Sequence, residues 1–202
     1  RMEMPEYAVA VFAGGSDSGI WDLARNQFGS ATPMTPFATS REVLGEVAAG
    51  RATVGVLPLP REGDADPWWT GIAVRDGLRV SYRLPFAARG DGRADGGLEA
   101  LAVGRIAPEA SGLDRSLVVI ETREALSRAG VTALAERVGI NGYPIASCMA
   151  GLYFQLLDTE GFVMEDDGRI ADLARLGDVA QVTVIGAYAA PMAEASAGGA
   201  PS

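Results

Sequence analysis

Hydrophobic and polar positions along the chain alternate between a strand period and a helix period, most clearly over residues 116–188. The strand runs alternate or are β-branched, and the helical runs repeat apolar residues every three or four positions. In order, the pattern predicts strand 116–122, helix 123–138, strands 140–148 and 151–158, helix 167–176 and strand 181–186. A short turn at Met149 and Ala150 would join the two middle strands. The order β-α-β-β-α-β is that of the ferredoxin-like split βαβ unit.

The first part of the chain alternates strands with helices in a way that favours a parallel sheet with right-handed crossovers. The predicted elements are strand 7–12, helix 18–28, strand 32–37, a helix capped by Thr39 or Ser40, and strands 52–58, 78–84 and 98–106. Glycine, aspartate and arginine dominate residues 88–97, which predict a flexible hairpin loop. We therefore expect an α/β protein with a small parallel or mixed-sheet lobe over 1–110 and a ferredoxin-like domain over 111–192. The tail, 193–202, is expected to be disordered.

Two adjacent tryptophans, Trp68 and Trp69, follow a polar turn over residues 60–67. Neighbouring side chains cannot share one face of a regular strand or helix, and Trp is rarely fully buried. We expect one ring to pack inward and the other to lie at the rim or at a partner contact.

Composition limits the class of protein. Hydrophobic residues make up 48% of the chain, yet no apolar run approaches the length of a membrane span, so a soluble, cytoplasmic protein without a membrane partner is expected. The net charge of −9 would repel phosphate backbones, which argues against nucleic acid as a partner.

The residue types that are absent exclude several kinds of chemistry. The chain has no His and no Lys, which removes Ser-His and Cys-His catalysis, the commonest metal ligand and Schiff-base formation. A single cysteine, Cys148, cannot form an internal disulfide or a thiolate metal site, and a half-buried strand residue is its expected role. No metal and no cofactor are expected, and any chemistry must use carboxylates, hydroxyls, Arg or backbone amides.

A glycine-rich segment follows the first predicted strand and precedes the first helix. Its residues Gly14, Gly15, Ser16 and Ser18 could bind an anion, because backbone amides at a helix N-terminus point toward such a ligand. Turn geometry alone is the alternative explanation of the two glycines.

Several short blocks resemble the ACT domain that ends prephenate dehydratases. The blocks begin at Ser116, Val138, Ile145, Tyr153 and Val184. Upstream, residues 47–50 and 54–58 look like the segment that precedes the dehydratase Glu-Asn-Ser triplet. The resemblance implies a truncated dehydratase-like lobe, similar to half of a type II periplasmic-binding fold, followed by an ACT-like domain.

The chain departs from that family where the reaction would take place. Pro60, Arg61 and Glu62 stand in place of Glu-Asn-Ser, and Leu98, Glu99 and Ala100 stand in place of the family's Thr-Arg-Phe. Just 13 residues, 85–97, occupy the place of a second dehydratase lobe. Together these departures indicate a module without dehydratase activity.

An active but divergent dehydratase is the first alternative. Glu62 and Asp64 would then be the candidate acids, and Arg61 would clamp a substrate carboxylate. The competing interpretation of these three residues is a solvated turn, since charged loop residues are usually exposed.

The resemblance also implies an aromatic amino-acid ligand at a dimer interface of the ACT-like domain. Its candidate contacts are Leu126, Gly130, Asn141, Ile145 and Ser147, with the strand supplied by a partner subunit. Asn141 follows a predicted helix stop, where local turn chemistry is the alternative.

Three functions remain open at this stage. The first is a non-catalytic regulatory or dimerisation module of phenylalanine biosynthesis, acting as a homodimer. The second is the divergent dehydratase, and the third is a purely structural oligomerisation domain. Since the sequence opens at Arg1, a chorismate mutase domain is expected to precede it.

Overall fold

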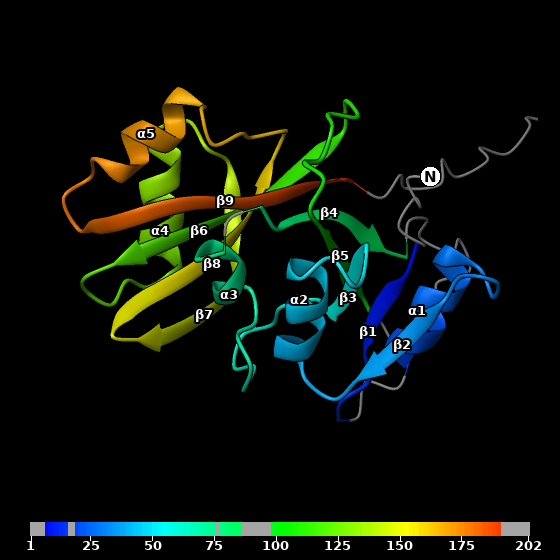
Figure 1. Ribbon diagram of the computed structural model, residues 1–202. Coiled ribbons are helices and arrows are strands. Elements are labelled where there is room, and N and C mark those ends of the chain that lie inside the picture. Colours follow the sequence, from blue (N-terminus) through cyan, green and yellow to red (C-terminus); the bar gives the residue numbers. More distant parts are fainter. Residues whose placement is uncertain (1–6, 16–18, 76, 86–97, 191–202) are drawn as a thin grey trace, which may run out of the picture.

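The computed structural model describes residues 7–15, 19–75, 77–85 and 98–190, and the strands of this part of the chain form one nine-stranded sheet. The strand order is β2-β1-β3-β5-β4-β9-β6-β8-β7, so the sheet runs from one end of the molecule to the other (Figure 1). The protein is therefore a mixed α/β fold built on a single large sheet, with parallel pairs at one end and antiparallel pairs at the other.

The N-terminal part alternates strands and helices as its pattern predicts. Its elements are β1 (Val9–Phe12), α1 (Gly19–Phe28), β2 (Met34–Phe37), α2 (Ser40–Ala48), β3 (Val54–Pro58), α3 (Thr70–Ala73), β4 (Arg79–Leu84) and β5 (Ala100–Gly104). The pairs β1–β2 and β1–β3 are parallel, while β5 is antiparallel to both β3 and β4.

The C-terminal part has the predicted order β-α-β-β-α-β. Its elements are β6 (Asp114–Thr122), α4 (Arg128–Glu136), β7 (Gly142–Ala150), β8 (Leu152–Glu160), α5 (Gly168–Ala174) and β9 (Val179–Ala189). Three antiparallel pairs arrange the strands as β9-β6-β8-β7. The element order was thus accessible from the sequence, whereas the division into domains at residue 110 stays a prediction.

One residue pair joins the two parts of the sheet. Val80 in β4 pairs in parallel with Gly186 in β9. Gly186 has φ +146°, and a Cβ placed on it would lie 2.2 Å from the Val80 carbonyl oxygen. Glycine is therefore required for this close approach of two backbones.

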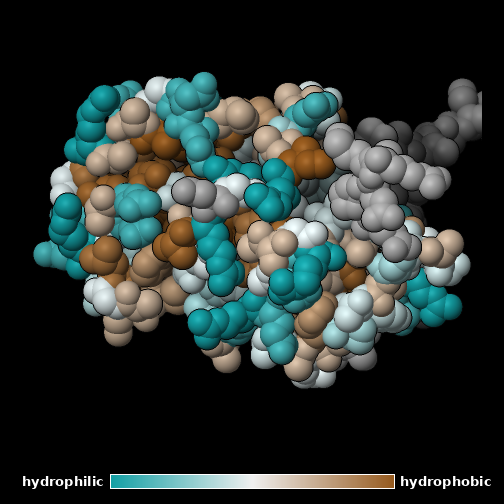
Figure 2. All heavy atoms as spheres, viewed as in Figure 1, coloured by the Kyte–Doolittle hydropathy of each residue, from teal (hydrophilic) through white to brown (hydrophobic). Residues whose placement is uncertain are grey.

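Helices cover both faces of the sheet. The first helix packs with a cluster that includes Val9 and Val56, and the last two helices pack with one that includes Val118 and Val184. Figure 2 shows hydrophobic residues between α4, α5 and β9 and mostly hydrophilic ones over α2. The largest cluster lies on the face that carries α2 and α3, and it spans both parts of the sheet.

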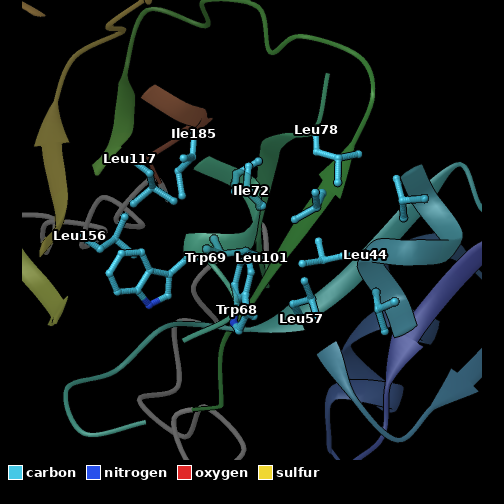
Figure 3. Close-up of a cluster of buried hydrophobic side chains, with 14 of the residues drawn as sticks. Leu44, Leu57, Trp68, Trp69, Ile72, Leu78, Leu101, Leu117, Leu156 and Ile185 are labelled. Atoms are coloured by element: carbon cyan, nitrogen blue, oxygen red, sulfur yellow. The ribbon is translucent and has the colours of Figure 1, made fainter. Parts of the chain in front are cut away.

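The expectation that one tryptophan would lie at the rim is wrong. Trp68 and Trp69 are 4% and 1% exposed, and both belong to the largest cluster. In Figure 3 the Trp69 ring extends toward Leu156, while Trp68 lies beside Leu101. Both rings are buried because they sit at the start of α3, where successive side chains diverge into different parts of one interior. The indole of Trp68 also donates to the Pro58 carbonyl at 3.0 Å.

The differences from the sequence prediction include two shifted boundaries and one element that was not predicted. The fourth helix begins at Arg128 rather than 123, because Ser127 caps it by accepting a hydrogen bond from the Gly130 amide. The turn between β7 and β8 lies at Gly151, whose φ of +80° suits glycine, rather than at Met149 and Ala150. The short helix α3 was not predicted at all, since four residues give too little periodicity.

Two further predictions concern residues that the structure does not describe. The hairpin loop at 88–97 and the disordered tail at 193–202 lie outside the described residues. Among the helices that are described, none has the length and apolar character needed to cross a membrane.

Candidate functional site

A pocket of about 440 Å³ opens at the carboxyl ends of the parallel strands. Phe12 ends β1, Pro58 ends β3, and both line it together with the start of α2. Helices leave β1 and β2 toward opposite faces of the sheet, so the pocket lies where the direction of winding changes. In open α/β sheets this is the usual place for a ligand. The pocket is therefore the candidate functional site.

The N-terminus of α2 forms one wall. Thr39 is its N-cap and accepts a hydrogen bond from the Glu42 amide at 3.2 Å, while Glu42 Oε2 accepts from the Thr39 amide at 3.0 Å. This reciprocal capping box fixes the first turn. Ser40, 1% exposed, follows directly and also lines the pocket. The wall combines hydroxyl groups with the positive end of a helix dipole.

Of the predicted anion-binding residues, Gly14 and Gly15 line the pocket, and Ser16 and Ser18 lie outside the described residues. A Cβ on Gly14 would lie 2.3 Å from the Ala38 carbonyl oxygen, so a larger residue would displace the segment that leads into α2. Gly15 has φ +69°. Both glycines thus have a geometric reason to be present, and they also leave the pocket floor open.

The charged lining is more negative than positive. Arg61, Asp64, Asp66 and Glu99 contribute to the wall, so one arginine faces three carboxylates and the formal charge is −2. The Arg61 amide donates to Asp64 Oδ2 at 2.7 Å, which closes a tight turn. Two of the three predicted catalytic candidates, Arg61 and Asp64, therefore do lie at the pocket.

Glu62, the third candidate, points elsewhere. Its carboxylate accepts a hydrogen bond from the Ser147 hydroxyl in β7 and pairs with Arg128 at the start of α4 at 3.4 Å. Arg128 also donates to the Pro144 carbonyl. The loop 60–67 thus borders the pocket on one side and is tied to the C-terminal part on the other.

The predicted ligand-binding residues do not form one cluster within the chain. Ser147 contacts Glu62, and the partly buried Ile145 packs against the largest cluster. Leu126 packs on the opposite face of the sheet, near the helix start that contains Gly130. The exposed Asn141 uses its carbonyl to accept from the Glu160 amide, as expected of a turn residue. The predicted site required a partner subunit, and it stays a prediction.

The single cysteine is half-buried in β7, in agreement with its expected structural role. Burial raises the pKa of the Cys148 thiol, and the nearby Glu62 carboxylate raises it further. A raised pKa lowers the thiolate fraction at neutral pH, which is the opposite of what a cysteine nucleophile needs.

A chain of polar contacts starts at the half-buried Glu99 on the pocket wall and leads into the interior. Arg83 in β4 donates through Nε and Nη2 to Glu99 Oε1 at 3.1 and 2.7 Å. Its third nitrogen, Nη1, donates to the Tyr188 hydroxyl in β9 at 3.1 Å. Arg83 thus links the pocket wall to the C-terminal part of the sheet.

The contacts continue to an almost fully buried carboxylate. Tyr188 donates to Asp158 Oδ2 at 2.7 Å, and Arg115 Nε donates to Asp158 Oδ1 at 2.6 Å. The Asp158 side chain is 3% exposed. Burial raises the pKa of the Tyr188 hydroxyl, and the Asp158 carboxylate adds to that rise, so the hydroxyl keeps its proton. We call Glu99, Arg83, Tyr188, Asp158 and Arg115 the buried polar chain.

Comparison with solved structures relates this arrangement to known proteins. A prephenate dehydratase from Arthrobacter aurescens in complex with L-Phe superposes with a TM-score of 0.62 at 17% identity, covering 90% of each chain. One from Streptococcus mutans gives 0.61 at 18% identity, covering 92% of this chain and 100% of that one. The chain has a prephenate dehydratase-like fold. GqqA, described as a novel type of quorum quenching acylase, gives 0.62 at 16% identity, with 91% and 95% coverage. No protein-family model matches the sequence, and no curated protein does either.

Nothing in the sequence indicated that the members of the buried polar chain contact one another. Tyr188 and Asp158 follow apolar runs, and Arg83 lies in a strand that alternates polar and apolar residues. Asp158 ends the run Leu156-Leu157, and Tyr188 follows Ala187. A carboxylate in a run that is otherwise buried is the one signal that could have indicated a paired charge. Its partners Arg83 and Arg115 lie 75 and 43 residues away, and no local pattern identifies them.

Proposed function

We propose that this protein is a non-catalytic regulatory module with the prephenate dehydratase-like fold, and that its pocket binds an amino acid with an apolar, aromatic side chain. The resemblance in sequence ties such a module to phenylalanine biosynthesis. The proposal places the ligand in the N-terminal pocket rather than at the predicted subunit interface.

The observation that carries the proposal is the charge of the pocket. Prephenate is a dicarboxylate. The three carboxylates of the wall outnumber Arg61 and the Arg83 guanidinium that is bonded to Glu99, so the site opposes a second negative charge on the ligand. A single carboxylate can be accommodated near the start of α2 beside Ser40, since the amide and hydroxyl of Thr39 are already bonded to Glu42. The surplus carboxylates then favour a positive group on the same molecule.

The remaining wall is apolar. Phe12, Leu59 and Leu98 line the pocket, and they suit a hydrophobic side chain better than a second polar group. A zwitterion with an aromatic side chain satisfies all three parts of the wall. One of the structurally similar dehydratases was solved in complex with L-Phe, which supports this choice of ligand class.

The substitutions at the reaction site support the absence of catalysis. The predicted acid Glu62 is engaged with Ser147 and Arg128, and Asp64 accepts a hydrogen bond in its own turn. The ACT-like character of residues 111–192, the homodimer and a preceding chorismate mutase remain predictions from the resemblance.

Calorimetric titration of the purified protein with phenylalanine, tyrosine, tryptophan and prephenate tests the proposal, with a parallel assay of prephenate turnover. We expect heat of binding with at least one aromatic amino acid, weaker binding of prephenate, and no turnover. At a hundred times its dissociation constant the bound ligand should stabilise the fold by about 2.7 kcal/mol, which thermal denaturation detects. Turnover of prephenate would instead show that the protein is a divergent dehydratase. The absence of binding heat with all four ligands would favour a purely structural domain.

A variant locates the site. Gly14→Val introduces a branched side chain against the Ala38 carbonyl and into the pocket, so amino-acid binding should disappear. Gly168→Ala is the matched control, since nothing lies near an added Cβ there and the position is remote from the pocket.

A further inference from the structure

Glu99 is the carboxylate of the pocket wall whose orientation the structure explains. It directly precedes β5, where Leu101 and Val103 point to the face that carries α2. Because strand side chains alternate, Glu99 points to that same face, whereas Leu98 packs against the cluster on the other face, and both residues line the pocket.

The hydrogen bonds of Glu99 leave one oxygen available. Arg83 donates twice, through Nε and Nη2, and both hydrogen bonds end at Oε1. Among the described residues, none donates to Oε2. A carboxylate that is anchored through one oxygen can accept a cationic donor through the other.

We propose that Glu99 accepts the ammonium group of the pocket ligand, and that Arg83 is the positioning residue that sets this carboxylate, held in turn by Tyr188 and Asp158. This inference rests on the proposed function and adds the residue that makes the pocket select amines. It also makes recognition in the N-terminal part depend on two strands of the C-terminal part.

Arg83 can act in this way because its guanidinium has little freedom. The side chain is 19% exposed, Nη1 is bonded to the Tyr188 hydroxyl, and Asp158 Oδ2 lies 3.9 Å from it. The guanidinium carbon also lies 5.7 Å from the centre of the Tyr188 ring, within cation–π range. Because Nη1 is held by Tyr188, the orientation of the guanidinium is fixed, and Nε and Nη2 both point toward Glu99.

The Tyr188 hydroxyl is the appropriate atom to remove. Tyr188→Phe keeps the ring and the cation–π contact while it deletes the hydrogen bonds to Arg83 and Asp158. Tyr82→Phe is the matched control, since Tyr82 precedes Arg83 in the same strand, is 51% exposed and belongs to no part of the buried polar chain.

The experiment compares L-phenylalanine with 3-phenylpropionate, which lacks the amine, by calorimetry on the wild type and the two variants. We expect the wild type to prefer phenylalanine. Tyr188→Phe should weaken phenylalanine binding about fivefold, which corresponds to the loss of one ordinary hydrogen bond of about 1 kcal/mol, and should leave 3-phenylpropionate unchanged. Glu99→Gln should abolish the preference altogether, and Tyr82→Phe should change neither affinity.

The outcomes separate this inference from the proposed function. Equal weakening of both ligands in Tyr188→Phe, or no change in either, would overturn the positioning role while amino-acid binding stands. A wild type that binds 3-phenylpropionate as tightly as phenylalanine would overturn the role of Glu99. A wild type that binds neither ligand would overturn this inference together with the proposed function. Urea denaturation of each variant confirms that the compared proteins are folded.

Discussion

Gly186 in β9 lies against the backbone of Val80 in β4, so close that an added Cβ would be 2.5 Å from the Val80 nitrogen and 2.2 Å from its carbonyl oxygen. The contact is the one residue pair by which β4 and β9 are joined in the sheet. Gly186→Ala combines the cost of an unfavourable φ with that of overpacking, and we expect a loss of stability on the order of 3 kcal/mol. Urea denaturation measures it.

Gly151→Ala is the control for that prediction. Gly151 also has a positive φ, +80°, but nothing lies within 4 Å of an added Cβ. Its cost should be limited to backbone strain, about 1–2 kcal/mol. Equal losses of stability in the two variants would mean that the close approach of β4 to β9 adds no cost beyond backbone strain.

The buried carboxylate of Asp158 provides the second prediction. Asp158→Asn removes the charge that compensates Arg115, whose side chain is 20% exposed, and leaves the Tyr188 hydroxyl in place. Removing one member of a buried ion pair typically costs about 3–5 kcal/mol, and we expect a loss in that range by urea denaturation. Asp172→Asn, in an exposed pair with Arg175, should change stability by less than about 0.5 kcal/mol.

The buried carboxyl group of Glu121 should make the stability of the protein depend on pH. Glu121 is 8% exposed, and this burial raises the pKa of its carboxyl group. The folded state therefore holds the proton more tightly than the unfolded state. The contribution of Glu121 to stability is fully present below its unfolded pKa and is lost as the pH rises through its folded pKa. Glu121→Gln should be more stable than the wild type at pH 8, and the difference should vanish at pH 3.5. A difference independent of pH would contradict this explanation.

We predict that the Cys148 thiol is alkylated slowly. Because burial and then Glu62 raise the pKa of the thiol, iodoacetamide at pH 8 should modify Cys148 more slowly than it modifies the cysteine of an unstructured peptide. Glu62→Gln should increase the rate, whereas Glu109→Gln, at an exposed loop position, should leave it unchanged. Mass spectrometry of the intact protein follows the reaction. Faster modification than in the peptide would show that the thiol is activated.

The sequence predicted the elements of this fold better than the contacts between them. Alternation over 116–122 and the helical spacing before Gly139 were sufficient to order the C-terminal elements, because each pattern is local. The pairing of Val80 with Gly186 could not be predicted, since it joins strands 106 residues apart through a backbone contact. The tryptophan pair was interpreted wrongly because the short helix that begins directly after the two residues has no periodicity of its own.

The candidate site was predicted in part for the same reason. The glycine-rich segment and the loop with Arg61 and Asp64 were recognised by composition, and the structure brings them to one pocket. In the sequence, Glu99 was identified as one of three residues that replace the dehydratase Thr-Arg-Phe motif, but no function was predicted for it. The role proposed for Glu99 depends on Arg83 in β4 and Tyr188 in β9. These two residues are far apart in the sequence, and the fold of the sheet brings them together.

The position of β9 has a consequence for the synthesis of the protein. The strand follows every other described strand in the sequence, yet it lies between β4 and β6 inside the sheet. While a ribosome is still adding residues 179–189, the earlier strands must wait as two separate ribbons, each with an uncovered edge where β9 will insert. The nascent chain is therefore most exposed to misassociation just before β9 emerges.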